Sequence, residues 1–222
     1  MLQQLTRHLA AHRTWLAAAT VAALTAGTVS TASAETTFKI DINSTDQEAE
    51  DVGLTPPITA PEWDGVTEGT PKTIGDVTFN SFGISRTRES DGSANPDKLL
   101  ADFVFGNAGL EITNLPEGVW DVEIWSFDAG FRADSQIIGI KDVDGETSLT
   151  DDFDANADTP FTFQFNSAEY ADTFQFFVRS DDESGDNDRE RMNAVQLTLI
   201  PEPASVALFG LGGIMLLSRR RR

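Results

Sequence analysis

The chain has 222 residues, a length typical of one domain with terminal extensions. Residues 35–200 carry 35 acidic and 10 basic side chains, a net charge of −25 that repels phosphate and excludes nucleic acid as a partner of this part. There is no cysteine, and His8 and His12 both lie in the first 34 residues. Disulfides, thiol nucleophiles and, within residues 35–200, histidine-based triads and zinc sites are therefore excluded.

Residues 1–34 have the pattern of a secretory signal peptide. A basic region is followed by an apolar stretch and then by small residues, ending in the A-x-A sequence Ala32-Ser33-Ala34. We predict cleavage after Ala34 and export of the remaining chain. An uncleaved N-terminal membrane anchor is the alternative.

The C-terminal residues 201–222 combine three features in a fixed order. Pro201-Glu202-Pro203 is followed by an apolar run over residues 206–217 and by four arginines at 219–222. The run is shorter than the roughly 20 residues that span a bilayer comfortably. The order resembles the PEP-CTERM sorting signal of Gram-negative bacteria. The resemblance implies a transient anchor in the inner membrane, processing by an exosortase-type enzyme, and delivery to the cell surface or extracellular matrix. An ordinary tail anchor is the alternative.

Residues 35–200 show the alternation of apolar and polar residues that is typical of β-strands, separated by Gly, Pro, Asn and Asp. The pattern predicts strands over residues 37–43, 76–85, 99–106, 109–115, 118–128, 135–143, 160–166, 172–180 and 192–200. No stretch shows helical periodicity. Regularly spaced strands predict one all-β domain, a sandwich or barrel, with long loops at 44–72 and 86–98.

The order of elements resembles the galactose-binding-like jelly rolls, which include malectin-like and other carbohydrate-binding modules. The resemblance rests on five segments in chain order: residues 41–43 in the first strand, residues 86–88, residues 102–105, the stretch from Leu115 to Asp128, and residues 193–197 in the last strand. It implies a single jelly-roll-type antiparallel β-sandwich and a carbohydrate ligand held by variable loops.

Aromatic and polar side chains that could hold a sugar occur near the predicted loops. Pyranose rings stack on exposed tryptophan, and neighbouring polar groups bind the hydroxyls. The candidates are Trp63, Arg86, Arg88, Trp125, Asp128 and Arg132. Two alternatives stay open: Trp125 belongs to the core, and the arginines pair with surplus carboxylates.

Several acidic segments could hold Ca²⁺, because hard cations prefer oxygen ligands. The candidates are Asp152, Asp154, Asn156, Asp158, Asp181, Glu183, Asp186 and Asp188. None of these segments matches a known calcium loop. The jelly-roll resemblance also implies a structural Ca²⁺, the only cofactor that we consider, whereas solvated acidic loops are the alternative.

Three functions are compatible with the sequence. A non-catalytic surface protein that binds carbohydrate or exopolysaccharide is preferred, and a polyanionic matrix protein cross-linked by Ca²⁺ is the first alternative. A polysaccharide-active enzyme is the second, for which Asp121, Glu123 and Tyr170 are the available groups. Nothing marks these groups as catalytic, so we predict no catalytic residue.

Overall fold

The computed structural model describes residues 36–45, 57–87, 99–128, 136–155, 159–180 and 190–201. All of them lie in Glu35–Pro201, one of the two units into which the chain divides. The predicted signal peptide and residues 202–222 of the sorting tail lie outside the described residues.

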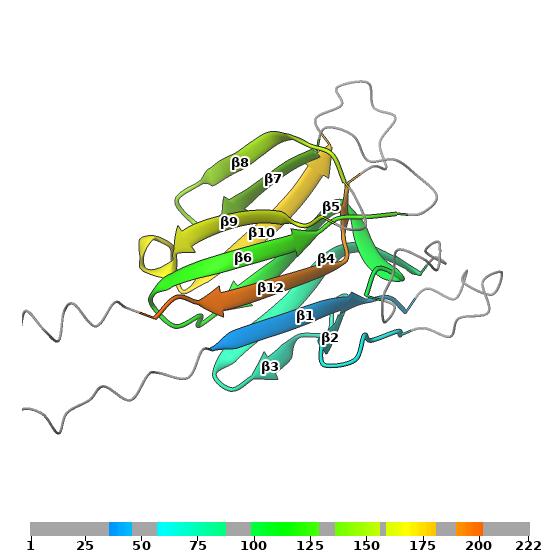
Figure 1. Cartoon of the computed structure of the whole chain (residues 1–222), viewed down its shortest axis with the longest axis horizontal. Helices are drawn as coiled ribbons and strands as arrows, with labels where there is room; N and C mark the ends of the chain where they lie inside the picture. Colours follow the sequence, from blue (N-terminus) through cyan, green and yellow to red (C-terminus); the bar gives the residue numbers. More distant parts are fainter. Residues whose placement is uncertain are drawn as a thin grey trace, which may run out of the picture. The chain divides into compact units, whose positions relative to one another are not determined.

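One layer, called here the front sheet, lies toward the viewer in Figure 1. Its strand order is β2 (Asp64–Thr67), β1 (Thr37–Asn43), β12 (Ala194–Leu199), β6 (Val119–Trp125) and β9 (Phe161–Asn166). The pairs from β1 through β12 and β6 to β9 are antiparallel, whereas β2 runs parallel to β1.

The second layer, called the back sheet, lies behind the first (Figure 1). Its strand order is β3 (Lys72–Ile74), β4 (Val77–Thr87), β5 (Asp102–Thr113), β10 (Thr173–Ser180), β7 (Gln136–Lys141) and β8 (Glu146–Phe153). The short β11 (Arg191–Met192) also pairs with β5, and a 3₁₀ turn at Ser167–Glu169 connects β9 to β10. The described part is therefore a β-sandwich, as predicted.

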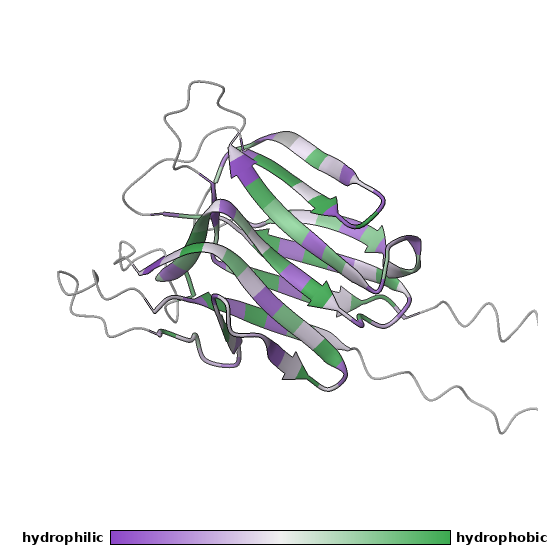
Figure 2. Cartoon of the chain, turned by 180° about the vertical axis from the view of Figure 1, so that it is seen from behind, coloured by the Kyte–Doolittle hydropathy of each residue, from purple (hydrophilic) through white to green (hydrophobic). Residues whose placement is uncertain are grey.

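Aromatic rings from the two sheets meet in the core. The ring centroid of Phe38 in the front sheet lies 5.4 Å from that of Phe79 in the back sheet, and the ring centroids of Phe165 and Phe176 are also 5.4 Å apart. Trp120 is completely buried, and its indole N–H donates to the carbonyl of Pro116 at 3.1 Å. Figure 2 shows the alternation of hydrophobic and hydrophilic residues along the strands, which allows each sheet to bury one face.

The structure corrects the predicted strands in three places. The predicted loop 44–72 contains β2, and β3 begins at its end. The two segments at 99–106 and 109–115 form the single strand β5, because Gly106 and Asn107 take positive φ angles and absorb an irregularity in the pairing with β4. The strand β8 was not predicted, because it lies at a sheet edge, is largely exposed and lacks an apolar alternation.

Candidate functional site

The outer face of the front sheet carries the polar side chains that the core excludes. Along β6, Trp120, Val122 and Ile124 are buried, so the alternation of the strand turns Asp121, Glu123 and Trp125 to the outside. Trp125, half-buried, therefore lies on the face opposite to its buried neighbours in β6.

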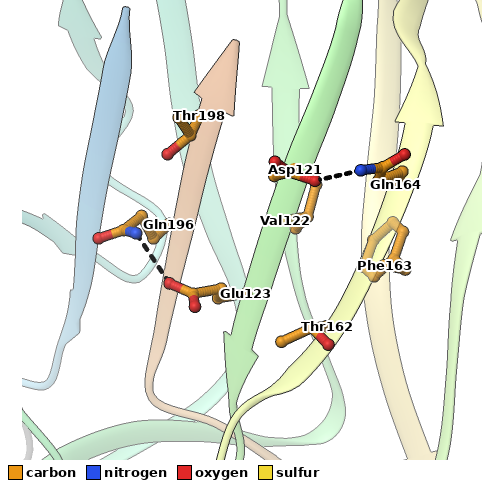
Figure 3. Close-up of a pocket in the computed structure, with 8 residues that line it drawn as sticks. All are labelled: Asp121, Val122, Glu123, Thr162, Phe163, Gln164, Gln196 and Thr198. Atoms are coloured by element: carbon orange, nitrogen blue, oxygen red, sulfur yellow. Dashed lines mark hydrogen bonds between the residues drawn. The ribbon is translucent and has the colours of Figure 1, made fainter. Parts of the chain in front are cut away.

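Two rows of polar side chains cross the outer face, because the strands that carry them are in register. Gln196, Glu123 and Thr162 are aligned in one row, and Thr198, Asp121 and Gln164 in the next. Together with Val122 and Phe163 they line an open groove of about 500 Å³ (Figure 3).

Amide groups hold both carboxylates of the groove in place. The Gln196 Nε2 group donates to Glu123 Oε2 at 2.7 Å, and Gln164 Nε2 donates to Asp121 Oδ1 at 2.7 Å. Figure 3 shows the two pairs on either side of β6. Each carboxylate has a second oxygen, so the groove presents acceptors in fixed positions to a ligand.

A pair of tryptophans extends this face beyond Glu123. Trp63, which precedes β2, meets Trp125 edge to face with ring centroids 5.4 Å apart and an interplanar angle of 87°. Both side chains are half-buried, and Lys39 Nζ lies 6.0 Å from the Trp63 ring. The structure thus brings together two of the predicted carbohydrate-contact residues from distant parts of the sequence.

Asp128 and Arg86, two other predicted contact residues, do not join the tryptophans. Asp128 is 4% exposed and accepts a hydrogen bond from Arg191 Nε at 3.0 Å, so this carboxylate is unavailable to a ligand on the outer face. Arg86 belongs to the back sheet, where its guanidinium lies 5.0 Å from the Phe105 ring. Arg88 and Arg132 lie outside the described residues.

Most of the predicted calcium ligands cannot be placed. Asp152 is exposed in β8, and Asp154 follows that strand and is exposed as well. The remaining candidates, Asn156, Asp158, Asp181, Glu183, Asp186 and Asp188, lie outside the described residues. Within the described ranges, no three acidic or histidine side chains are grouped so that they could hold a metal ion.

Two buried acids were missed by the sequence analysis. Asp41 and Asp102 are both 0% exposed. Asp41 Oδ2 accepts from the Ala60 N–H at 2.6 Å, and Asp102 Oδ2 accepts from the Ile58 and Ser44 N–H groups at 2.9 and 3.1 Å. In β1, Asp41 alternates with the core residues Ile40 and Ile42, so the alternation predicts a solvated side chain on the outer face. No signal in the sequence marked Asp41 as buried.

Burial is the main cause that raises the pKa of Asp41 to about 8. The hydrogen bond from Ala60 opposes the shift, and the nearby charge of Asp102 adds to it. Burial also raises the pKa of Asp102, against its hydrogen bonds. These carboxyls fasten residues 58–60 to the end of the sandwich, so their role is structural.

Tyr170, considered as a catalytic group, packs against the core. Its ring centroid lies 5.8 Å from that of Phe165 and 5.9 Å from that of Phe174. Burial, followed by the charges of Glu169 and Asp142, raises the pKa of its hydroxyl. A raised pKa disfavours the phenolate that general-base catalysis requires.

Residues 199–222 match the PEP-CTERM protein-sorting motif, which confirms the resemblance seen in the tail. The motif indicates an exported protein of the cell envelope or surface and supports an exosortase as its processing partner. None of the helices among the described residues has the length and hydrophobicity to cross a membrane. No curated protein sequence matches the chain.

The solved structures that match part of the chain include a β-glucuronidase and two carbohydrate-binding modules. β-Glucuronidase 2 of Bacteroides uniformis is 15% identical, with a TM-score of 0.41, over 74% of this chain and 18% of the enzyme. A mutant of the module CBM29-2, from family 29 of the carbohydrate-binding modules, is 10% identical over 74% of this chain and 91% of the module, with a TM-score of 0.28. TmCBM61 in complex with β-1,4-galactotriose is 11% identical over 58% and 90%, with a TM-score of 0.28. The chain thus spans less than a fifth of the glucuronidase and most of each module.

Proposed function

We propose that this protein is a non-catalytic surface protein that binds a polysaccharide on the outer face of its front sheet. The observation that carries the proposal is that Trp125, which contacts Trp63, lies on the same face of β6 as a groove lined by amides, hydroxyls and carboxylates. The producing cell is then a Gram-negative bacterium whose inner membrane holds the tail until an exosortase processes it. The ligand is a glycan of the cell surface or of the surrounding matrix.

The two parts of this face suit the two sides of a sugar ring. The apolar face of a pyranose stacks on an indole, while its hydroxyls need fixed donors and acceptors. Neighbouring strands lie about 4.8 Å apart, so the aligned rows offer a repeated set of polar groups across the sheet. A repeated set of contacts favours a polymer over a single sugar.

The arrangement of Asp121 and Glu123 supports binding over hydrolysis. A glycosidase needs two carboxyl groups in different environments, one of them with a raised pKa in an apolar site. Here each carboxylate accepts a hydrogen bond from a glutamine amide on the same polar face. Both carboxylates therefore have the same kind of partner and serve as hydrogen-bond acceptors, which suits binding.

A binding assay of the purified full-length chain on a broad glycan panel, including the producer's own polysaccharide, tests the proposal. We expect Trp125→Ala and Trp63→Ala each to weaken binding about tenfold or more, since each removes one to a few kcal/mol of stacking contact. Val143→Ala is the control, because Val143 is 84% exposed in the turn between β7 and β8. The absence of binding to every glycan of the panel would reject the proposal.

A Ca²⁺-dependent matrix function is the second candidate, favoured by the net charge of −25 over residues 35–200. Ca²⁺ bound by the acidic segments would relieve repulsion and link neighbouring molecules. Light scattering distinguishes the two functions: Ca²⁺ at millimolar concentration produces larger assemblies without any sugar, whereas equal Mg²⁺ does not. No growth in particle size with Ca²⁺ would reject this candidate.

A further inference from the structure

Building on the proposed function, we infer that the glycan in the groove is a polymer of hexosamine units whose amino groups are free and positively charged. The inference follows from the charges of the groove. Of the described residues that line it, Asp121 and Glu123 are the charged ones, and both are acids. Lysine and arginine are absent from this lining.

Neither carboxylate forms an ion pair with another described residue. In the described part of the chain, the ion pairs join Lys72 to Asp64, Arg179 to Glu146 and Arg191 to Asp128. Lys39 shares a row with Gln196, but its ammonium lies over the Trp63 ring. Among the described residues, the groove therefore presents two acidic groups without a basic partner, and a ligand that brings positive charge would supply one.

The two carboxylates are also placed in a fixed orientation. They stand two residues apart on β6, a separation of roughly 7 Å along the strand. The amides of Gln196 and Gln164 each hold one oxygen. An ammonium donates three hydrogen bonds, and charge-assisted bonds to carboxylates are about twice as strong as neutral ones. A preorganised acceptor pair of this kind suits cationic groups repeated along a chain.

The same charges discriminate against other polysaccharides. Uronate and sulfate groups would face Asp121 and Glu123 as like charges, within a protein body that is already strongly negative. An N-acetylated hexosamine has a neutral amide in place of the ammonium, so it leaves both carboxylates without a positive partner. A neutral glucan loses the same interaction.

Calorimetric titration of the full-length chain with three hexamers of one backbone geometry tests the inference. The probes are β-1,4-linked glucosamine, N-acetylglucosamine and glucose, used at mildly acidic pH, where the amine of glucosamine is protonated. We expect the glucosamine hexamer to bind about tenfold or more tightly than the other two. Its affinity should fall as NaCl is raised.

Two variants of the groove and two matched controls separate a built site from bulk charge. Asp121→Asn and Glu123→Gln keep the shape of each side chain, and each should weaken glucosamine-hexamer binding about three- to tenfold. Glu117→Gln and Asp144→Asn remove one exposed acid outside the groove and should leave the affinity unchanged. Hexalysine serves as a control polycation.

Each outcome decides the question. Equal binding of the N-acetylated or neutral hexamer, unaffected by the groove variants, overturns the inference but leaves the proposed function standing. Hexalysine binding as tightly as the glucosamine hexamer, with equal losses in all four variants, overturns it in favour of bulk attraction. The absence of binding to these hexamers and to every glycan of the panel rejects both proposals.

Discussion

At the scale of single residues, burial decides what each acidic side chain of this protein does. Asp121 and Glu123 lie on an open face and accept hydrogen bonds from glutamine amides. Asp128 is buried and is paired with Arg191, whereas Asp41 is buried and accepts a backbone N–H group. The same functional group therefore contributes to a binding face, to an internal ion pair or to the anchoring of a loop.

Asp41 should make the protein less stable as the pH rises. Its pKa is raised from 3.8 to about 8, so the folded state binds the proton more tightly than the unfolded state. This contribution is complete below about pH 4 and is lost as the pH approaches 8, a total of the order of 5 kcal/mol. Urea unfolding at several pH values between about 4 and 9 measures it.

The matched variant for this test is Asp41→Asn, which replaces the carboxyl with a neutral group of the same shape. We expect it to flatten the pH dependence and to be more stable than the parent at pH 9. Asp144→Asn, at an exposed position, should leave the profile unchanged. If the stability of the parent and that of Asp41→Asn changed with pH in the same way, the pH dependence could not be assigned to the Asp41 carboxyl.

Removal of Arg191 should destabilise the fold strongly. Arg191 is 2% exposed, pairs with Asp128, and stacks its guanidinium 5.2 Å from both the Phe103 and Phe105 rings. Arg191→Met removes the buried cation that pairs with Asp128, and breaking a buried ion pair from one side costs about 3–5 kcal/mol. The double variant Arg191→Met/Asp128→Asn should recover part of the loss in thermal unfolding. A single variant as stable as the parent would show that the pair contributes nothing.

At the scale of the elements, regular strands place the groove, and glycines allow close packing on the opposite side of the sandwich. In the front sheet, the register of β12, β6 and β9 aligns the polar rows. In the back sheet, Phe82 lies over Gly109 and Phe177 lies over Gly139, so that each ring covers the backbone of a neighbouring strand.

Gly109→Ala should therefore destabilise the back sheet. A Cβ atom at this position would overlap the Phe82 ring and the carbonyl oxygen of Phe176, and the backbone carbonyl cannot move away without disturbing β10. We expect a loss of about 1–3 kcal/mol in thermal or urea unfolding. Phe82→Ala added to Gly109→Ala should relieve only part of the loss, because the clash with the backbone remains. An unchanged melting temperature for Gly109→Ala would contradict this packing.

At the scale of the whole molecule, the excess of acids works against folding. The 35 acidic residues between positions 35 and 200 outnumber the 10 basic ones, and the excess like charges repel one another more strongly in the folded state than in the unfolded chain. This excess also keeps the protein soluble and draws cations toward its surface. The sorting motif directs this acidic body to the cell envelope or surface.

Salt should stabilise the protein. Raising NaCl from about 10 mM to about 300 mM shortens the screening length from roughly 30 Å to well below 10 Å, which weakens repulsion among the surface carboxylates. We expect the melting temperature to rise by several degrees in differential scanning calorimetry. KCl should have the same effect if screening is the cause. A constant or falling melting temperature would show that charge repulsion is not a significant cost.

The sequence alone determined the features that depend on neighbouring residues. Export and the sorting tail follow from contiguous motifs, and the all-β class follows from the two-residue period of the strands. Local order carries this information because the backbone of a strand turns successive side chains to opposite faces, whatever the strand packs against.

Only the tertiary structure decided which of these residues act together. Trp125 meets Trp63, and Glu123 meets Gln196, through pairings between distant segments that no local pattern contains. Asp41 and Asp128 occupy positions that could have been solvated, but residues 58–60 cover the first and Arg191 pairs with the second. Strand alternation sets the face of a side chain, whereas its burial and its partner depend on which other segment packs there. For this reason the tryptophans could be proposed from the sequence, but the groove beside them could not.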